Sequence, residues 1–306
     1  MTSFGDVAEA FQKIEMTGYL PTTEMATAAF LADRMDKPIL VEGAPGVGKT
    51  QFAKSVAQAL DRELIRLQCY EGLDETRALY EWEYAKQLLY TQILKDKIGE
   101  TLRDTQSLSE AADRISQEEA VFFSERFLLP RPLLQAILSP RPVLLLIDEI
   151  DKSDPEFEPL LLELLSDYAV TIPELGTLKA KHIPRAVLTS NNTRELSDAL
   201  KRRCLHLNIE FPSLEREMQI VRTRLPGLAE QLISDLVFWV QKLRQLDLKK
   251  SPSIAETLDW AQSLVVLNAT ELTPSLINAT LSLVLKNTSD LETAQASLAP
   301  WQVSRP

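Results

Sequence analysis

The stretch Gly43-Ala44-Pro45-Gly46-Val47-Gly48-Lys49-Thr50 decides the fold of this chain of 306 residues. It matches the pattern G-x-x-x-x-G-K-[ST], in which glycines let backbone N–H groups turn inward around phosphate oxygens. The apolar residues 39–41 before it predict a strand, and a helix is expected over about residues 49–60. The N-terminus of that helix would add a positive dipole end. The stretch therefore predicts a strand, a phosphate-binding loop and a helix.

The residue types of this loop assign a role to each part of it. Lys49 is expected to place its charge on the β- and γ-phosphates, and Thr50 to offer its hydroxyl to Mg²⁺. The predicted nucleotide-binding residues are Gly43, Ala44, Pro45, Gly46, Val47, Gly48, Lys49, Thr50 and Gln51.

A second stretch, Val143-Leu144-Leu145-Leu146-Ile147-Asp148-Glu149, predicts a buried strand that ends in two carboxylates. In parallel sheets ligands bind at this carboxyl edge. We expect Asp148 to hold Mg²⁺ directly or through water, and Glu149 to orient and deprotonate the attacking water.

Polar residues downstream complete the candidate site. Asn191 ends the fourth predicted strand, where its amide could fix the attacking water or the γ-phosphate, and Asn192 is interpreted as the N-cap of the next helix. Lys201-Arg202-Arg203 precedes the fifth strand. One of these arginines is expected to reach the γ-phosphate bound by a neighbouring subunit. The alternative is a solvated basic turn.

Short apolar segments separated by helical patterns indicate an α/β domain with a mostly parallel sheet. The predicted strands cover residues 39–41, 64–69, 144–147, 186–189 and 205–209. Capping boxes are expected at residues 153–156, 192–195 and 253–256. After Ser213 only amphipathic stretches follow, such as 232–243 and 254–267. We therefore expect a nucleotide-binding domain over 1–211 and a small helical domain over 212–306.

About 70 residues separate the second and third strands, which is too many for an ordinary connection. Leu94, Ile98 and Leu102 recur at helical spacing, and acidic residues outnumber basic ones. Residues 73–130 are therefore predicted to be a helical insert with an acidic face. Its role is either decoration of the core or a surface for a partner, and Arg77, Tyr80, Trp82 and Tyr84 are its most distinctive residues.

Composition excludes several classes of protein. With 45% hydrophobic and 25% charged residues, the chain is not disordered as a whole. Its net charge of −11 argues against coating nucleic acid or anionic membranes. Cys69 and Cys204 cannot form a disulfide framework, and with His182 and His206 they lack zinc-site spacing. No run approaches the ~18 apolar residues of a membrane helix, and the N-terminus lacks signal-peptide features, so we expect a cytoplasmic protein.

Taken in order, these elements resemble the AAA+ ATPases over residues 37–267. Leu162-Glu163-Leu164-Leu165-Ser166-Asp167, followed by Val170-Thr171-Ile172, is similar to a stretch of the MoxR group, which also carries an insert after its second strand. Three further strings resemble its CoxD-like branch. They are Gly72-Leu73-Asp74-Glu75, Ala78-Leu79-Tyr80-Glu81-Trp82 and Ser251-Pro252-Ser253-Ile254-Ala255-Glu256-Thr257-Leu258-Asp259-Trp260.

The resemblance implies an αβα core with a five-stranded parallel sheet, a helical insert and a small all-α lid. It implies Mg²⁺-dependent hydrolysis of ATP to ADP and phosphate in a hexameric ring, with ATP between subunits. The implied role is chaperone or remodelling work on a protein client, such as maturation of a metalloenzyme, often with a von Willebrand factor A domain partner. By this matching Asn191 is the sensor-1 residue and Arg203 the arginine finger, with Arg202 as its rival.

One departure concerns the lid, where MoxR proteins commonly place an arginine after Ser-Pro. Here Ser253 and Ile254 follow Ser251-Pro252, so Lys249 or Lys250 substitutes for the arginine, or the lid couples to nucleotide by packing alone.

Three other functions are weighed against a protein-directed ATPase. A DNA-directed motor would need a basic pore, a non-hydrolysing switch would lack Glu149, and a small-molecule kinase would lack the helical lid and the paired arginines.

Overall fold

The computed structural model describes residues 3–90, 92, 125–173 and 175–301. The predicted insert helix containing Leu94, Ile98 and Leu102 lies outside these residues. Before the glycine-rich loop the chain forms two helices that the sequence analysis did not assign, α1 (Val7–Glu15) and α2 (Thr23–Met35).

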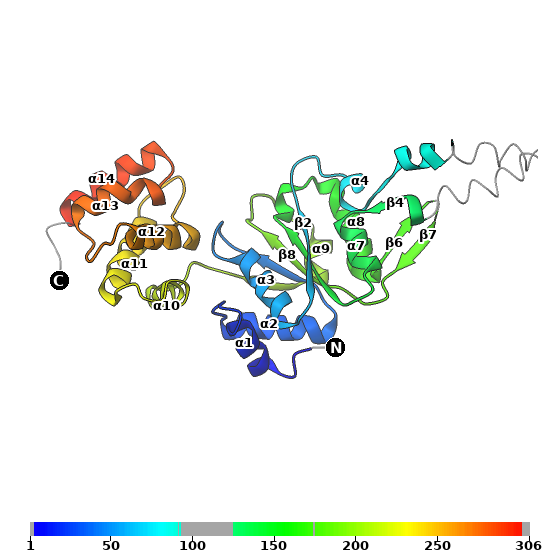
Figure 1. The fold of residues 1–306 in the computed structure, drawn as a ribbon, viewed down its shortest axis with the longest axis horizontal. Coiled ribbons are helices and arrows are strands. Elements are labelled where there is room, and N and C mark those ends of the chain that lie inside the picture. The colour runs from blue at the N-terminus through cyan, green and yellow to red at the C-terminus, as the bar shows by residue number, and fades with distance from the viewer. Residues whose placement is uncertain (1–2, 91, 93–124, 174, 302–306) are drawn as a thin grey trace, which may run out of the picture. The chain divides into compact units, whose positions relative to one another are not determined.

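A five-stranded parallel sheet forms the centre of the fold, with strand order β2-β5-β8-β1-β9. Figure 1 shows the ribbon and labels β2 and β8 of this sheet. Its strands are β1 (Ile39–Glu42), β2 (Glu63–Gln68), β5 (Val143–Asp148), β8 (Arg185–Ser190) and β9 (Leu205–Asn208). The predicted α/β fold and its five strands are therefore confirmed. In the register of the sheet Gln68 lies beside Asp148, and Ile147 lies beside Leu188.

Strand β5 is buried on both of its faces. Val143, Leu145 and Ile147 pack in one cluster with residues of α7 (Pro132–Leu138) and α8 (Glu158–Asp167). Leu144 and Leu146 are also buried, and they face the other side because side chains alternate along a strand. This burial explains why the strand is apolar at every position before Asp148.

Two small antiparallel sheets were not predicted. Strand β3 (Tyr80–Trp82) pairs with β4 (Leu128–Pro130), and β6 (Ala169–Ile172) pairs with β7 (Gly176–Lys179). Strands of three or four residues are too short to show a period of two. The described part of the insert thus begins with α4 (Glu75–Ala78) and β3, continues as a helix over residues 84–90, and ends in β4.

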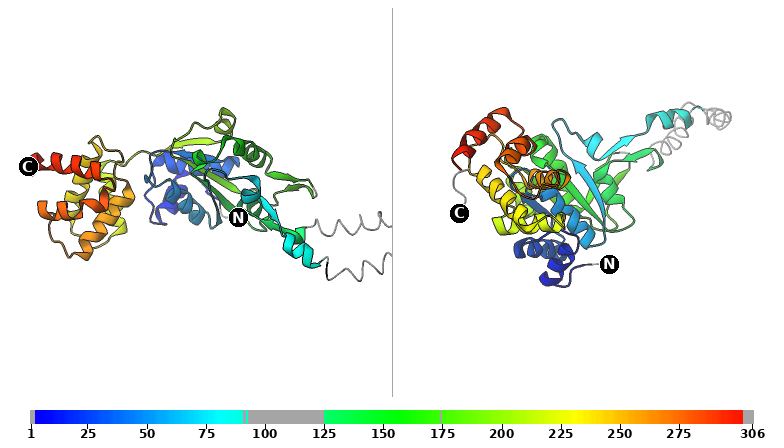
Figure 2. Two further views of the ribbon diagram at one scale, coloured as in Figure 1. Left: turned by 90° about the horizontal axis from the view of Figure 1, so that it is seen from above. Right: turned by 60° about the vertical axis from the view of Figure 1, so that its left-hand side comes forward.

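Beyond residue 213, the elements of the described chain are helices, as predicted. They are α10 (Leu214–Arg224), α11 (Glu230–Arg244), α12 (Ile254–Val266), α13 (Pro274–Val284) and α14 (Thr288–Trp301), and we call them the C-terminal bundle. Figure 2 shows the bundle from two further sides. Its core contains Leu236, Trp260 and Leu281, each fully buried.

The three predicted capping boxes differ in outcome. Ser253 and Glu256 form the expected reciprocal bonds at the start of α12. The box at Ser153 is wrong, because the Ser153 hydroxyl donates to the Ile150 carbonyl, and α8 begins only at Glu158 after a short 3-10 turn. Asn192 is not an N-cap either.

Asn192 has a φ of 57°, whereas the helix α9 (Asp198–Arg203) is capped by Ser197. The Asn192 to Glu195 stretch is therefore a turn before the helix. Asparagine tolerates the left-handed region that this turn requires, which is also why it resembled a cap in the sequence.

The chain forms two compact units that interleave along the sequence. One comprises residues 1–4, 28–40 and 60–206, and the other comprises residues 5–27, 41–59 and 207–306. The carboxylates after β5 belong to the first unit, and the glycine-rich loop shares the second unit with the C-terminal bundle. The domain boundary expected near Pro212 stays a prediction.

Candidate functional site

The glycine-rich loop connects β1 to the helix α3 (Lys49–Ala59). Gly46 has a φ of +76°, and a Cβ atom placed there would lie 2.2 Å from the Ser253 Cβ. At Gly43 a Cβ atom would lie 2.1 Å from the Ile209 carbonyl oxygen. Both positions therefore require glycine, because neighbouring chain approaches the loop too closely for a side chain.

Lys49 lies at the start of α3, and its side chain is folded back over the loop. It is only 6% exposed, and its Nζ donates to the carbonyl oxygens of Gly43 at 2.7 Å and Ala44 at 2.8 Å. An ammonium group at this place, beside the N-terminus of a helix, suits the binding of an anion. Thr50 and Gln51 follow in the first turn of α3, and their contacts with nucleotide stay predictions.

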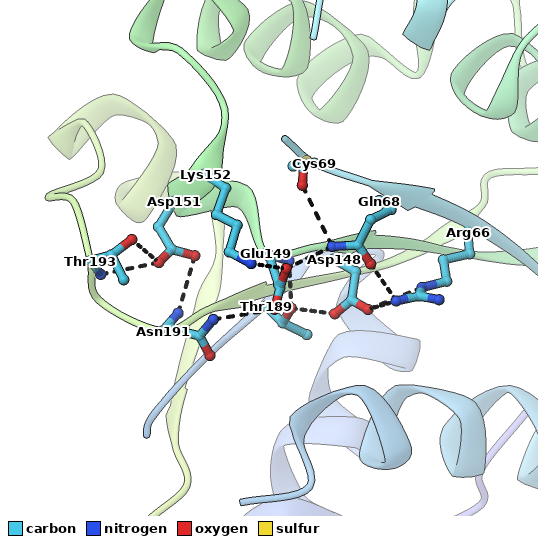
Figure 3. A network of polar contacts seen from close by, with 10 residues as sticks. All are labelled: Arg66, Gln68, Cys69, Asp148, Glu149, Asp151, Lys152, Thr189, Asn191 and Thr193. Atoms are coloured by element: carbon cyan, nitrogen blue, oxygen red, sulfur yellow. Dashed lines mark hydrogen bonds and ion pairs between the residues drawn. The ribbon is translucent and has the colours of Figure 1, made fainter. Parts of the chain in front are cut away.

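Asp148 ends β5 as a buried carboxylate that is 1% exposed (Figure 3). Its Oδ2 accepts from Arg66 Nε at 3.0 Å and Nη2 at 2.5 Å, and its Oδ1 accepts from Thr189 Oγ1 at 2.6 Å. A buried charge is stable only when it is paired in this way. The two neighbouring strands β2 and β8 thus fix the direction of the carboxylate.

Glu149 follows with a φ of 58°, which is unusual for a residue with a long side chain. Its N–H donates to Thr189 Oγ1 at 2.9 Å. Its Oε2 accepts from Gln68 Nε2 at 2.8 Å and from Lys152 Nζ at 2.7 Å. The hydrogen bond that Lys152 donates to Glu149 raises the pKa of Lys152. The strained turn therefore directs the Glu149 carboxylate along the sheet edge instead of continuing the strand.

Asn191 lies beside this carboxylate, as the shared sheet edge predicts. Its Nδ2 is 3.5 Å from Glu149 Oε1, and its backbone N–H donates to Asp151 Oδ1 at 3.1 Å. Asp151 Oδ2 accepts from Thr193 N at 3.0 Å and from Thr193 Oγ1 at 2.5 Å. Burial opposes ionisation of Asp151, but these hydrogen bonds outweigh burial and lower its pKa. Asp151 therefore anchors the turn that positions Asn191.

Cys69 is next to this cluster but is unsuited to act as a nucleophile. Burial, followed by the negative charges of Asp148, Asp151 and Glu149, raises the pKa of Cys69 to about 12. Its thiol stays protonated at neutral pH.

Several residues of this cluster were missed by the sequence analysis. They are Arg66, Gln68, Asp151, Lys152, Thr189 and Thr193. Knowledge of the strand order would have identified Gln68 and Thr189, because both lie near the ends of strands that flank β5. Without the order, a polar residue near the end of a predicted strand looks like ordinary turn chemistry.

The two arginines lie at the end of α9, and both are exposed. Arg203 donates through Nε to Ser166 Oγ of α8 and through Nη1 to the Ala199 carbonyl at 3.2 Å. These contacts hold the Arg203 guanidinium on the surface of the unit that carries it. The roles of Arg202 and Arg203 towards a neighbouring subunit stay predictions.

The lysines considered as substitutes for the lid arginine lie before α12. The backbone N–H groups of Lys249 and Lys250 donate to Asp290, and Lys250 Nζ is 3.5 Å from Glu256 Oε1. In the same unit, the Ile254 N–H donates to the Gly46 carbonyl at 3.2 Å. The start of α12 thus contacts the glycine-rich loop through its backbone.

Within the part of the chain that the structure describes, no cluster of three or more His, Cys, Asp or Glu side chains could hold a metal ion by itself. In nucleotide sites Mg²⁺ is usually held by one or two protein oxygens together with phosphate oxygens and water. Asp148 and Thr50 offer oxygen atoms of the required type.

A parallel sheet with a glycine-rich loop after β1 and adjacent carboxylates after β5 defines a P-loop nucleotide-binding protein. Residues 38–204, more than half of the chain, match the family model of the AAA domain (dynein-related subfamily), so the chain belongs to this family. This domain implies a P-loop ATPase that binds nucleotide, usually with Mg²⁺. A comparison with curated proteins found no match.

Proposed function

We propose that the protein is a Mg²⁺-dependent ATPase that hydrolyses ATP to ADP and phosphate. The observation that carries this proposal is the pair of carboxylates after β5. Asp148 is buried and held by Arg66 and Thr189, whereas Glu149 is turned along the sheet edge beside Asn191. A nucleotide switch without hydrolysis has no need of the second carboxylate.

The proposed roles follow from the chemistry of each group. Lys49 and the N–H groups of the loop bind the phosphates, and Thr50 and Asp148 would hold Mg²⁺, which neutralises phosphate charge when bound. Glu149 accepts a proton from the attacking water, and Asn191 orients that water or the γ-phosphate. The contacts of Glu149 with Gln68 and Lys152 both use Oε2, so Oε1, which lies beside Asn191, is the oxygen proposed to accept this proton.

We further propose that the protein is a remodelling factor of the MoxR type. AAA+ proteins commonly form hexameric rings, and the dynein-related subfamily includes MoxR-like proteins. The insert between β2 and β5 and the Val170-Thr171-Ile172 strand support this assignment. The client would be a protein, such as a metalloenzyme during maturation, with a von Willebrand factor A domain protein as partner.

Within the described residues, no helix is both long and apolar enough to cross a membrane.

The test is Glu149→Gln in the full chain, measured as phosphate release and as ATP binding. We expect turnover to fall by ~10²-fold or more while ATP stays bound, because only the proton acceptor is removed. The matched control is Glu156→Gln, since Glu156 is exposed on the 3-10 turn before α8 and should leave both measurements unchanged. Equal turnover in Glu149→Gln and the parent would show that Glu149 is not the base.

A further inference from the structure

The C-terminal bundle contains a buried ion pair between α11 and α10. Arg244 Nη1 and Nη2 donate to the two carboxylate oxygens of Glu217 at 2.6 and 2.7 Å, and the side chains are 7% and 0% exposed. Glu217 also accepts from Thr257 Oγ1 of α12 at 2.8 Å and from Gln241 Nε2 at 2.8 Å. The pair therefore joins three helices of the bundle at one point.

Arg244 also reaches beyond this pair to the segment that precedes α12. Its Nε donates to the Pro252 carbonyl at 2.7 Å, and its guanidinium carbon lies 4.6 Å from the centre of the Phe211 ring. Because a guanidinium is a rigid planar fork, the bidentate bond to Glu217 fixes where its Nε points. Arg244 thus fixes the position of the Pro252 carbonyl.

The two residues after Pro252 connect it to the glycine-rich loop. Ser253 caps α12 through its capping box, and Ile254, the first residue of the helix, donates its N–H to the Gly46 carbonyl at 3.2 Å. The Ser253 side chain fills the space that a side chain at position 46 would need. Gly46 therefore contacts the start of α12 both through the hydrogen bond from Ile254 and through close packing against Ser253.

The bond to Gly46 has a consequence for the next N–H group of the loop. The peptide bond between Gly46 and Val47 is planar and trans, so its C=O and N–H point in opposite directions. With the Gly46 carbonyl bonded to α12, the Val47 N–H is turned away from α12. A phosphate-binding loop binds its anion through backbone N–H groups, so their orientation determines how well it binds.

We propose that Arg244 is a positioning residue that, through Pro252 and the Ile254 N–H, holds the Gly46–Val47 peptide ready for phosphate and so couples the C-terminal bundle to the bound nucleotide. This inference rests on the proposed nucleotide binding by the loop. It gives the bundle a backbone link to the phosphate site at the place where a lid arginine was expected. No charged side chain of α12 is needed for this link.

The sharpest test is Ile254→Pro in the full chain. Proline is accepted at the first position of a helix, and the preceding Ser253 already has the extended backbone that proline requires. The substitution removes the N–H that donates to Gly46 and puts the proline Cδ where the Gly46 carbonyl now approaches, while α12 can still form. Ile254→Val is the matched control, because it shortens the side chain and keeps the N–H.

Three quantities are measured for each variant: the thermal midpoint without nucleotide, the dissociation constant for ATP in a Glu149→Gln background, and the hydrogen exchange of the loop peptide without nucleotide. For Ile254→Pro we expect an ATP dissociation constant at least about fivefold higher, because one hydrogen bond is lost and the Gly46 carbonyl is displaced, together with faster loop exchange. The thermal midpoint should stay close to that of Ile254→Val.

Arg244→Lys should shift ATP binding and loop exchange in the same direction, since lysine keeps the charge but cannot bond Glu217 and Pro252 together. Its control is Arg222→Lys, because Arg222 pairs with Glu230 on the exposed surface of the same bundle. Equal ATP binding and loop exchange in Arg244→Lys and Arg222→Lys would overturn the role of Arg244, even if Ile254→Pro has its expected effect.

Equal ATP binding and loop exchange in Ile254→Pro and Ile254→Val, with a parent that binds ATP, would overturn the inference and leave the proposed function intact. A parent that binds neither ATP nor ADP would overturn the proposed function, and the inference with it.

Discussion

At the scale of single residues, the candidate site is a set of carboxylates with different partners. Asp148 is neutralised by Arg66, Glu149 bonds Lys152 at the rim, and Asp151 is held by N–H and O–H donors of the following turn. Adjacent negative charges repel one another, so each needs its own compensating group. The four residues 148–151 thus contain three carboxylates in three different environments, of which the first two are the proposed metal ligand and the proposed base.

The anchor gives a prediction about stability and pH. Asp151→Asn should lower the free energy of unfolding at pH 7 by about 2 kcal/mol, because an amide cannot replace a charged acceptor of three hydrogen bonds. The folded state lowers the pKa of Asp151, so its stabilisation is complete above the ordinary value of 3.8 and is lost as the pH falls through the lower folded value.

Urea unfolding between pH 3 and pH 7 measures this dependence. The parent should lose stability more steeply than Asp151→Asn at the acid end, so that the two curves converge there. Parallel curves over the whole range would show that Asp151 does not make this contribution.

At the scale of elements, α9 carries both candidate arginines and depends on a cap that sequence analysis misplaced. Ser197 Oγ accepts from the Leu200 N–H at 3.3 Å, and the Ser197 N–H donates to Glu158 Oε2 at 3.0 Å. Ser197→Ala should therefore destabilise the protein by about 1 kcal/mol. Asn192→Gly should have a much smaller effect, because glycine accepts the positive φ of that turn.

Chemical denaturation of the two variants shows whether Ser197 or Asn192 contributes more to stability. A larger loss for Asn192→Gly than for Ser197→Ala would restore Asn192 as the more important residue of this turn.

An element was predicted correctly when the residues that determine it lie close together in the sequence. The five sheet strands were found because apolar runs between breakers require no knowledge of partners, and Ser253 was found because both halves of its capping box lie within four residues. Asn192 and Ser153 failed because the same residue types also favour turns. Gln68 and Arg66 were missed because their value comes from pairing with β5, which lies far along the chain.

At the scale of the whole molecule, charge separates a protein-directed ATPase from a DNA motor. The net charge of −11 leaves little electrostatic attraction for a polyanion. We expect negligible binding to duplex DNA at physiological salt, measured by fluorescence anisotropy with and without ATP. Sub-micromolar binding that weakens with added salt would support the DNA-directed alternative instead.

Assembly gives the last prediction, which concerns Arg203. In the AAA+ arrangement an arginine before the last strand acts on the ATP of the next subunit, so Arg203→Ala should leave ATP affinity of the isolated subunit unchanged. The contacts that it loses, to Ser166 and the Ala199 carbonyl, lie within its own unit and on its surface. Turnover should fall by ~10³-fold if the finger has its usual weight.

Mixing two inactive variants tests whether Arg203 acts between subunits. Lys49→Ala subunits bind ATP poorly but still offer Arg203, whereas Arg203→Ala subunits bind ATP and offer no finger. A mixed ring should regain part of the activity, because some of its interfaces join an intact loop to an intact arginine. If mixed rings form, as shown by differently tagged subunits, and yet stay as inactive as their parents, Arg203 does not act in trans, and Arg202 becomes the candidate for the same experiment.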